Sequence, residues 1–132
     1  MLGQMMNMPL MISSLIRHAD DYHGDAEIVS RLPEGSMHRY TYRDAHRRSR
    51  QLANALRALG IKMGDRIGTL AWNTHRHFEI YFGVSGIGAI CHTINPRLFP
   101  EQISYIANHA GDDYIFFDIT FTALIEALVP HC

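Results

Sequence analysis

The alternation of apolar and polar positions between residues 64 and 97 predicts a strand, a helix and a second strand. Arg66 to Trp72 (RIGTLAW) follows a Gly-Asp turn signal and is short and apolar, which is typical of a buried strand. From His75 to Ile87 the apolar residues recur at helical spacings and predict a helix that is buried on most sides. Ile90 to Ile94 (ICHTI) is expected to be the second strand. A unit of this length joins parallel strands by a right-handed crossover.

Two elements are predicted at the N-terminal end. Ser13 or Ser14 is expected to cap a helix that ends near Tyr22. The runs 27–32 (EIVSRL) and 37–40 (MHRY) flank a Pro-Glu-Gly-Ser turn and predict an antiparallel hairpin. The apolar side of the helix is expected to comprise Leu15, Ile16 and Ala19, with Arg17, Asp20 and Asp21 facing water.

A longer helix is predicted to begin after Thr41 and to end at Gly60. Asp44 stands three residues after Thr41, which is the spacing of a capping box. Its expected apolar side consists of Tyr42, Ala45, Leu52, Ala55, Leu56 and Leu59, and its arginines are Arg43, Arg47, Arg48, Arg50 and Arg57.

After the central unit, the pattern predicts a helix from Phe99 or Pro100 to about His109, a parallel strand over 113–118 (DYIFFD) and a last helix over 121–129. Strands that alternate with helices indicate the α/β class. We therefore expect a mostly parallel sheet with helices on its faces and the hairpin as an antiparallel element. Residues 1–132 are expected to form one partial domain, in which residues 1–9 are flexible or take part in association.

Composition narrows the function classes. The chain of 132 residues is 47% hydrophobic and has a net charge of −1, so we expect no nucleic-acid partner. No apolar run approaches the roughly 18 residues of a membrane span. Cys91 and Cys132 do not form a disulfide pattern, which favours a reducing compartment. A cytoplasmic location is expected, either free or peripheral to a membrane.

Three groups of residues could be read as binding sites, but a structural role is favoured for each. The glycines of GVSGIG (83–88) follow a helix rather than precede one, so packing and helix termination are favoured over a phosphate loop. His75 and His77 point about 200° apart on a helix and are interpreted as surface or cap histidines rather than zinc ligands. The arginines of helix 42–59 are interpreted as a solvated face rather than a site for nucleic acid or an acidic headgroup.

Asn95, Pro96 and Arg97 are the best candidates for substrate binding. They are polar or conformationally restricted and follow a predicted parallel strand, where ligands of open α/β sheets tend to bind. A purely structural loop remains the favoured alternative. No catalytic, cofactor-binding or metal-ligating residue is assigned to this chain.

The ordered set GDRIGTLAWN, FEIYFGVSGIGA, HTINPRL and EQISYIANHA resembles the N-terminal part of AMP-forming acyl-CoA synthetases. It is most similar to the medium- and long-chain fatty-acid ligases, and the resemblance extends from about Leu10 to Asp118. It implies the N-terminal portion of the large AMP-binding domain. The implied reaction joins a fatty acid to CoA, with ATP and Mg²⁺, and releases AMP and pyrophosphate.

The family's phosphate loop, its Tyr-Gly-x-Thr-Glu stretch, its ribose-binding Asp and its C-terminal lysine have no counterpart between Met1 and Cys132. We therefore expect an N-terminal fragment that binds no cofactor and is inactive by itself. Its expected partners are the remainder of the synthetase chain, a fatty acid substrate and a second copy in a homo-oligomer. The alternatives are a stand-alone, non-catalytic α/β interaction module and, with less support, a small nucleotide-binding regulator.

Two further physical expectations concern Trp72 and the edges of the sheet. Trp72 ends an apolar strand and is expected to be largely buried. The three parallel strands are too apolar for an open sheet, so the isolated chain is expected to self-associate.

Overall fold

The computed structural model describes residues 3–4 and 6–132. In chain order the elements are α1 (Ile12–His23), β1 (Glu27–Arg31), β2 (Met37–Thr41), α2 (Tyr42–Ala58), β3 (Arg66–Leu70), α3 (His75–Gly86), β4 (Ile90–Thr93), α4 (Pro100–Ala110), β5 (Tyr114–Phe117), η1 (Ile119–Phe121), α5 (Thr122–Leu128) and η2 (Val129–His131). This order is the one that the hydrophobic pattern predicts. The expectation for residues 1–9 falls partly on residues 1–2 and 5, which lie outside the described residues.

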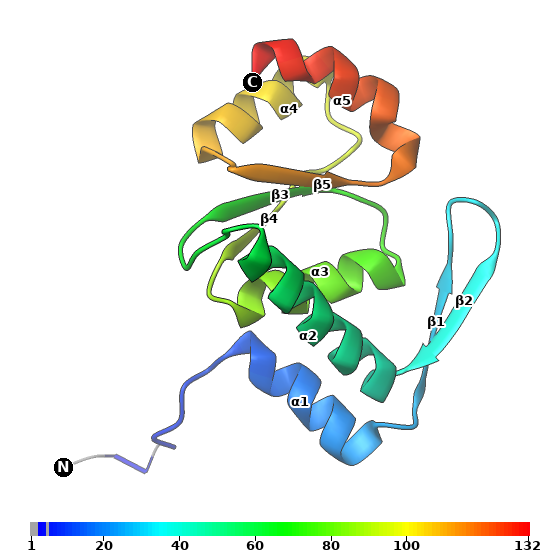
Figure 1. The fold of residues 1–132 in the computed structure, drawn as a ribbon, viewed down its shortest axis with the longest axis vertical. Coiled ribbons are helices and arrows are strands. Elements are labelled where there is room, and N and C mark those ends of the chain that lie inside the picture. The colour runs from blue at the N-terminus through cyan, green and yellow to red at the C-terminus, as the bar shows by residue number, and fades with distance from the viewer. Residues whose placement is uncertain (1–2, 5) are drawn as a thin grey trace.

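The α/β class is confirmed. Strands β3, β4 and β5 form a parallel sheet in the order β4-β3-β5, so β3 is the central strand. The predicted hairpin is also confirmed, with Glu27 opposite Thr41 and Arg31 opposite Met37. It forms a separate two-stranded sheet that stands beside α2 and α3 (Figure 1).

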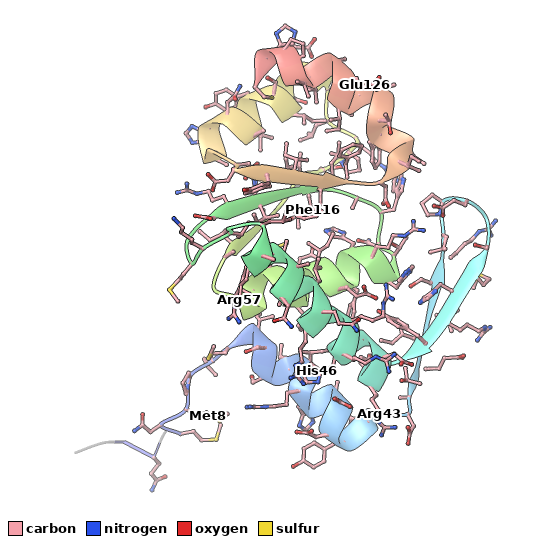
Figure 2. The ribbon with its side chains drawn as sticks, viewed as in Figure 1. Met8, Arg43, His46, Arg57, Phe116 and Glu126 are labelled. Atoms are coloured by element: carbon pink, nitrogen blue, oxygen red, sulfur yellow. The ribbon has the colours of Figure 1, made fainter. Side chains whose placement is uncertain are left out.

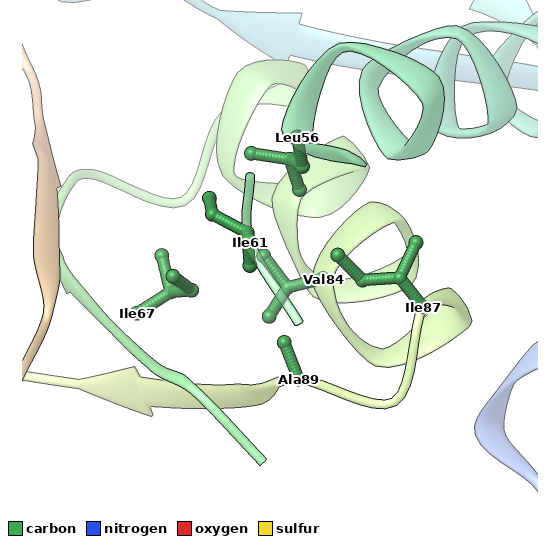
Figure 3. Close-up of a cluster of buried hydrophobic side chains, with 6 residues drawn as sticks. All are labelled: Leu56, Ile61, Ile67, Val84, Ile87 and Ala89. Atoms are coloured by element: carbon green, nitrogen blue, oxygen red, sulfur yellow. The ribbon is translucent and has the colours of Figure 1, made fainter. Parts of the chain in front are cut away.

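Helices cover both faces of the parallel sheet, with α2 and α3 on one side and α4 and α5 on the other (Figure 1). Ile67 and Leu70 lie three positions apart on β3 and therefore point to opposite faces. Ile67 packs into one apolar cluster, which comprises Leu56, Ile61, Ile67, Val84, Ile87 and Ala89 (Figure 3). Leu70 packs into the other, which comprises Leu70, Ile94, Ile103, Ala107 and Leu128.

Helix α2 begins as predicted. The backbone N–H of Asp44 donates to Oγ1 of Thr41 at 3.2 Å, and the N–H of Thr41 donates to the Asp44 carboxylate at 3.3 Å. This capping box lowers the pKa of Asp44, chiefly through the Thr41 backbone. The expected apolar side was partly wrong, because Ser49 lies inside the fold whereas Ala55 and Leu59 are exposed.

Helix α1 differs from the prediction at its start and on its apolar side. It begins at Ile12 without a side-chain cap, and the hydroxyl of Ser14 donates to the carbonyl of Met11 at 2.6 Å. Leu15 is 62% exposed, so it does not belong to the buried side. Ile16 alone reaches the core, where it packs with Tyr40 and Ala45.

The glycines of segment 83–88 serve packing and helix termination, as the sequence indicated. A Cβ atom on Gly83 would lie 2.9 Å from Cδ2 of Leu52, so glycine lets α3 approach α2 closely. Gly88 has φ of 80°, a left-handed conformation that favours glycine and turns the chain from α3 towards β4.

Candidate functional site

The three residues singled out from the sequence lie together just beyond β4. Oδ1 of Asn95 accepts a hydrogen bond from the backbone N–H of Arg97 at 3.0 Å, which makes an Asx turn. Asn95 therefore shapes the loop. The side chain of Arg97 is exposed and forms no ion pair within the part of the chain that the structure describes.

The segment after β3 forms the opposite side of this region. Asp118, which follows β5 and is buried, accepts a hydrogen bond from the backbone N–H of Trp72 at 2.7 Å. Nε1 of Trp72 donates to Oγ1 of Thr120 at 3.0 Å, and the indole ring lies 5.0 Å from the ring of Phe121. These contacts fasten the end of β3 to the end of β5.

The expectation that Trp72 is largely buried is wrong, because its side chain is 38% exposed. Strand β3 ends at Leu70, and Trp72 lies beyond the last pairing of the sheet. Its indole is held beyond the carboxyl end of the central strand by Thr120 and Phe121 instead of being enclosed between sheet and helices.

A cleft of about 430 Å³ opens between these two segments. Asn95, Pro96 and Arg97 line one side of it, and Trp72 and Asn73 line another. Helix α3 completes the wall with His77 and Tyr81. The structure thus brings the three predicted residues together and adds seven that sequence reasoning did not assign to the site, namely the four just named and Ala71, Thr93 and Ile94.

His77 is 5% exposed, so its interpretation as a surface or cap histidine is wrong. Nε2 of His77 lies 3.0 Å from Oγ1 of Thr69 on β3, and its ring stacks on Tyr81 with the centroids 4.7 Å apart. Burial lowers the pKa of His77, against smaller opposing effects of the Asp118 carboxylate and the Trp72 backbone. His77 is therefore a neutral wall of the cleft at pH 7. Tyr81 stands four positions later on the same helix face, which is the one sequence signal for this pair.

His75 is likewise buried, on the side of α3 that faces the hairpin. Its ring stacks on His38 of β2 with the centroids 3.7 Å apart, and Tyr40 lies edge-on at 5.8 Å. Burial, and then the neighbouring His38, lowers the pKa of His75. Glu79, one turn further along α3, is also buried.

The arginines of α2 largely form the expected solvated face, since Arg43, Arg47 and Arg50 are exposed. Arg48 has a further role, because its Nε donates to Oε1 of Glu79 at 2.7 Å. This bond raises the pKa of Arg48. Burial, together with Glu79, raises the pKa of Tyr40 well above its ordinary value, so the phenol stays neutral.

A larger cleft, of about 690 Å³, lies between α4 and the last helical turns. It is lined mainly by α4, from Pro100 to His109, and by Leu128 and His131. None of the residues proposed from the sequence lies in it.

Within residues 3–4 and 6–132, no group of three or more His, Cys, Asp or Glu side chains is arranged to hold a metal ion. No chemical step through a metal ion is therefore derived from these residues. Among those same residues, no helix has the length and apolar character needed to cross a membrane.

Comparison with proteins of known sequence gives matches along almost the whole chain. A 3-methylmercaptopropionyl-CoA ligase from Ruegeria lacuscaerulensis is 56% identical over 97% of this chain and 24% of its own length. A medium-chain-fatty-acid–CoA ligase from Ectopseudomonas oleovorans is 50% identical over 97% of this chain and 23% of its own length. The chain thus spans about a quarter of the length of the relatives it matches.

The fold also matches that of solved structures. The N-terminal domain of FACL13 from Mycobacterium tuberculosis matches with a TM-score of 0.77 and 24% identity, over 89% of this chain and 29% of that one. Residues 15–131 match the family described as AMP-binding enzyme. With most of its length inside this match, the chain belongs to the AMP-binding enzyme family.

Proposed function

We propose that this chain forms the N-terminal part of the large domain of a fatty-acid–CoA ligase. The observation that carries the proposal is the match over 97% of the chain to the Ectopseudomonas oleovorans ligase, which is named for that reaction. A long-chain-fatty-acid–CoA ligase from Thermus thermophilus, 46% identical over 94% of the chain, supports the same substrate class. The whole enzyme would use ATP, Mg²⁺ and CoA, and residues 1–132 would be one partial domain of it.

The proposed reaction first joins the carboxylate to AMP with release of pyrophosphate and then transfers the acyl group to the thiol of CoA. Charge develops on phosphoryl oxygens, which calls for cationic groups and N–H donors around them. Among the described residues no group of three or more His, Cys, Asp or Glu side chains is placed to hold a metal ion, and the glycines of segment 83–88 lie at the end of α3 rather than before a helix. In the proposal this chain supplies the scaffold and one edge of the acyl or CoA site, and it is inactive alone.

Within that edge we assign substrate contact to the loop of Asn95, Pro96 and Arg97. Asn95 holds the turn, Pro96 restricts it, and Arg97 presents a charge that no carboxylate of the described residues neutralises. CoA and the fatty acid are both anions. A guanidinium group at the mouth of the cleft suits an oxyanion of either one.

The test is a chimera in which this chain replaces the matching part of the Ectopseudomonas oleovorans ligase. Pyrophosphate release is measured with ATP, Mg²⁺, CoA and a panel of fatty acids. We expect turnover by the chimera and none by the chain alone. Turnover by the chain alone would contradict the proposal that it is inactive without the rest of the ligase. A folded chimera without turnover would favour a stand-alone interaction module.

Arg97→Gln in the chimera tests the loop. Loss of a charge-assisted hydrogen bond, about 1.5–3 kcal/mol, should raise KM for CoA or for the acid by about tenfold or more. Arg47→Gln is the matched control, because Arg47 is exposed on α2 and does not line the cleft. Equal kinetics of the two variants would remove Arg97 from the site.

We also propose that the protein is a cytoplasmic homo-oligomer, or is bound peripherally to a membrane. Large apolar side chains are exposed before and within α1, among them Met8, Leu10, Met11 and Leu15. Exposed apolar side chains of this size favour association. Sedimentation velocity at several concentrations tests the oligomer, and cell fractionation tests the location. A single monomer at all concentrations would exclude the oligomer.

A further inference from the structure

The five arginines of α2 fall into two groups. Arg43, Arg47 and Arg48 each lie 2.7 Å from a carboxylate, on Asp25, Asp44 and Glu79 respectively. Arg50 and Arg57 pair with no carboxylate in the part of the chain that the structure describes. They stand seven positions apart, which is about two helical turns, so both side chains emerge on one side of α2.

Arg50 and Arg57 line a cleft of about 290 Å³ between α1, α2 and α3. Ser13 and Asn54 add uncharged donors to its wall, and Ile16 and Phe82 supply apolar surface. No Asp or Glu lines the cleft.

The charged groups beside the cleft already have partners within the chain. His46, which also lines the cleft, has its Nδ1 2.7 Å from Oδ2 of Asp20 on α1. Figure 2 shows His46 where α2 packs on α1, and Arg57 further along α2. Asp20 also lies 3.8 Å from Arg43, so its carboxylate has His46 and Arg43 as partners and forms no ion pair with Arg50 or Arg57.

Helix ends contribute little net charge to this cleft. Ser13 lies in the first turn of α1, which has no capping side chain, and Gly86 is the last residue of α3. The two ends carry partial charges of about +0.5 and −0.5, which oppose each other. The permanently charged side chains that line the cleft are therefore the two guanidinium groups of Arg50 and Arg57.

We propose that this cleft binds a phosphate group through Arg50 and Arg57. The planar guanidinium group offers paired N–H donors that match phosphate oxygens, and two such groups neutralise a dianion. The source is either inorganic phosphate or the phosphate of a nucleotide such as the adenosine end of CoA. The cleft shares no lining residue with the cleft at Arg97, so this proposal does not depend on the proposed ligase activity.

The test is isothermal titration calorimetry of the 132-residue chain with two probes, inorganic phosphate and adenosine 3′,5′-bisphosphate, at constant ionic strength. We expect Arg50→Gln and Arg57→Gln each to weaken binding by about tenfold or more. Arg47→Gln, an exposed arginine of the same helix that already has a carboxylate partner, should bind like the unchanged chain. Binding of both probes would indicate a site for the phosphate itself, and binding of the bisphosphate alone would indicate a nucleotide site.

A second measurement uses the thermal midpoint, because a ligand that binds only the folded state raises it. Phosphate should raise the midpoint above that in chloride of the same ionic strength, and the two glutamine variants should lose this difference. The proposal is overturned by the absence of binding with both probes, by binding that survives both arginine substitutions, or by equal effects of phosphate and chloride.

Discussion

The two halves of α3 are buried to the same degree but in different surroundings. Val84, near its C-terminal end, is 0% exposed and packs with Leu56 and Ile67 in an entirely apolar cluster. His77, near its start, is 5% exposed and neighbours other polar residues. Helix α3 thus packs on an apolar core at one end and at the other forms a polar junction with the hairpin, around His38, Tyr40 and His75.

The polar junction also collects the buried side-chain atoms that lack a hydrogen-bond partner. Among the described residues these are His38 Nε2, Tyr40 OH, Thr74 Oγ1, His75 Nδ1 and His77 Nδ1. An unsatisfied buried group costs about 1–3 kcal/mol. Burial alone therefore does not indicate stabilisation: the apolar half of α3 should be sensitive to lost volume, and the polar half to charge and pH.

The largest effect should come from the apolar cluster into which the C-terminal half of α3 packs, and Leu56 of α2 is the position that tests it. Leu56→Ala removes a side chain that is 1% exposed and should lower the free energy of unfolding by about 2–5 kcal/mol. Leu59→Ala, on the same helix but exposed, should change it by less than about 0.5 kcal/mol. Urea denaturation measures both. Similar losses in the two variants would mean that α2 is rotated relative to the described structure.

The polar half is tested by Glu79→Gln, which keeps the shape of the side chain and removes its charge. Arg48 would lose its 2.7 Å ion pair, and we expect a loss of about 1–3 kcal/mol in the free energy of unfolding. Arg47→Gln disrupts the exposed pair with Asp44 and should cost about 0–1 kcal/mol. If Glu79→Gln cost no more than this control, the buried pair would not stabilise the junction.

The pH dependence of stability should also distinguish the two halves. Burial lowers the pKa of His75 and His77 in the folded state, so the unfolded chain binds their protons more readily. Stability should therefore be maintained above about pH 6.5 and fall as the pH drops below it, by up to about 1.4 kcal/mol per pH unit for each group. His75→Gln should reduce the dependence of stability on pH. Leu56→Val should lower stability at every pH and leave the pH dependence unchanged. A slope that is unaffected by His75→Gln would assign the proton uptake elsewhere.

The smallest perturbation is labelling of the two thiols. Cys91 packs against the apolar cluster, and burial raises its pKa to about 11, whereas Cys132 is exposed. Because the thiolate is the reactive form, a disulfide reagent should modify Cys132 rapidly and Cys91 slowly. Modification of Cys91 should accelerate in Leu56→Ala. Equal rates for both thiols in the unchanged chain would show that the apolar cluster opens readily.

Local signals predicted the elements well. The Pro-Glu-Gly-Ser turn, the Thr41–Asp44 capping box and the alternation of apolar strands and helices each act within a few residues, and each appears in the structure. The position of the candidate loop at 95–97 also followed from the strand before it. The other walls of its cleft come from β3 and α3, and one sequence contains no signal that pairs them with this loop.

The misassigned residues depend on contacts between distant segments. His75 is buried because the hairpin, far earlier in the chain, packs on the first turn of α3 and supplies His38. Trp72 is partly exposed because Asp118 and Thr120 hold it beyond the carboxyl end of the central strand. Periodicity assigns faces to a helix or a strand, but it does not indicate which element will cover each face.

The central position of β3 has a consequence for the order of folding. One edge of β3 pairs with β4, which follows soon after in the chain, whereas the other edge pairs with β5, with Ile67 opposite Tyr114. At a synthesis rate of about 5–20 residues per second, the chain between these partners takes about 2–10 s to make. During that interval a nascent chain has β3 with one edge unpaired, and Asp118 has not yet fastened its end. The strand at the centre of the finished sheet therefore has an open edge until β5 has been made, and during that interval it is exposed to pairing with another nascent chain.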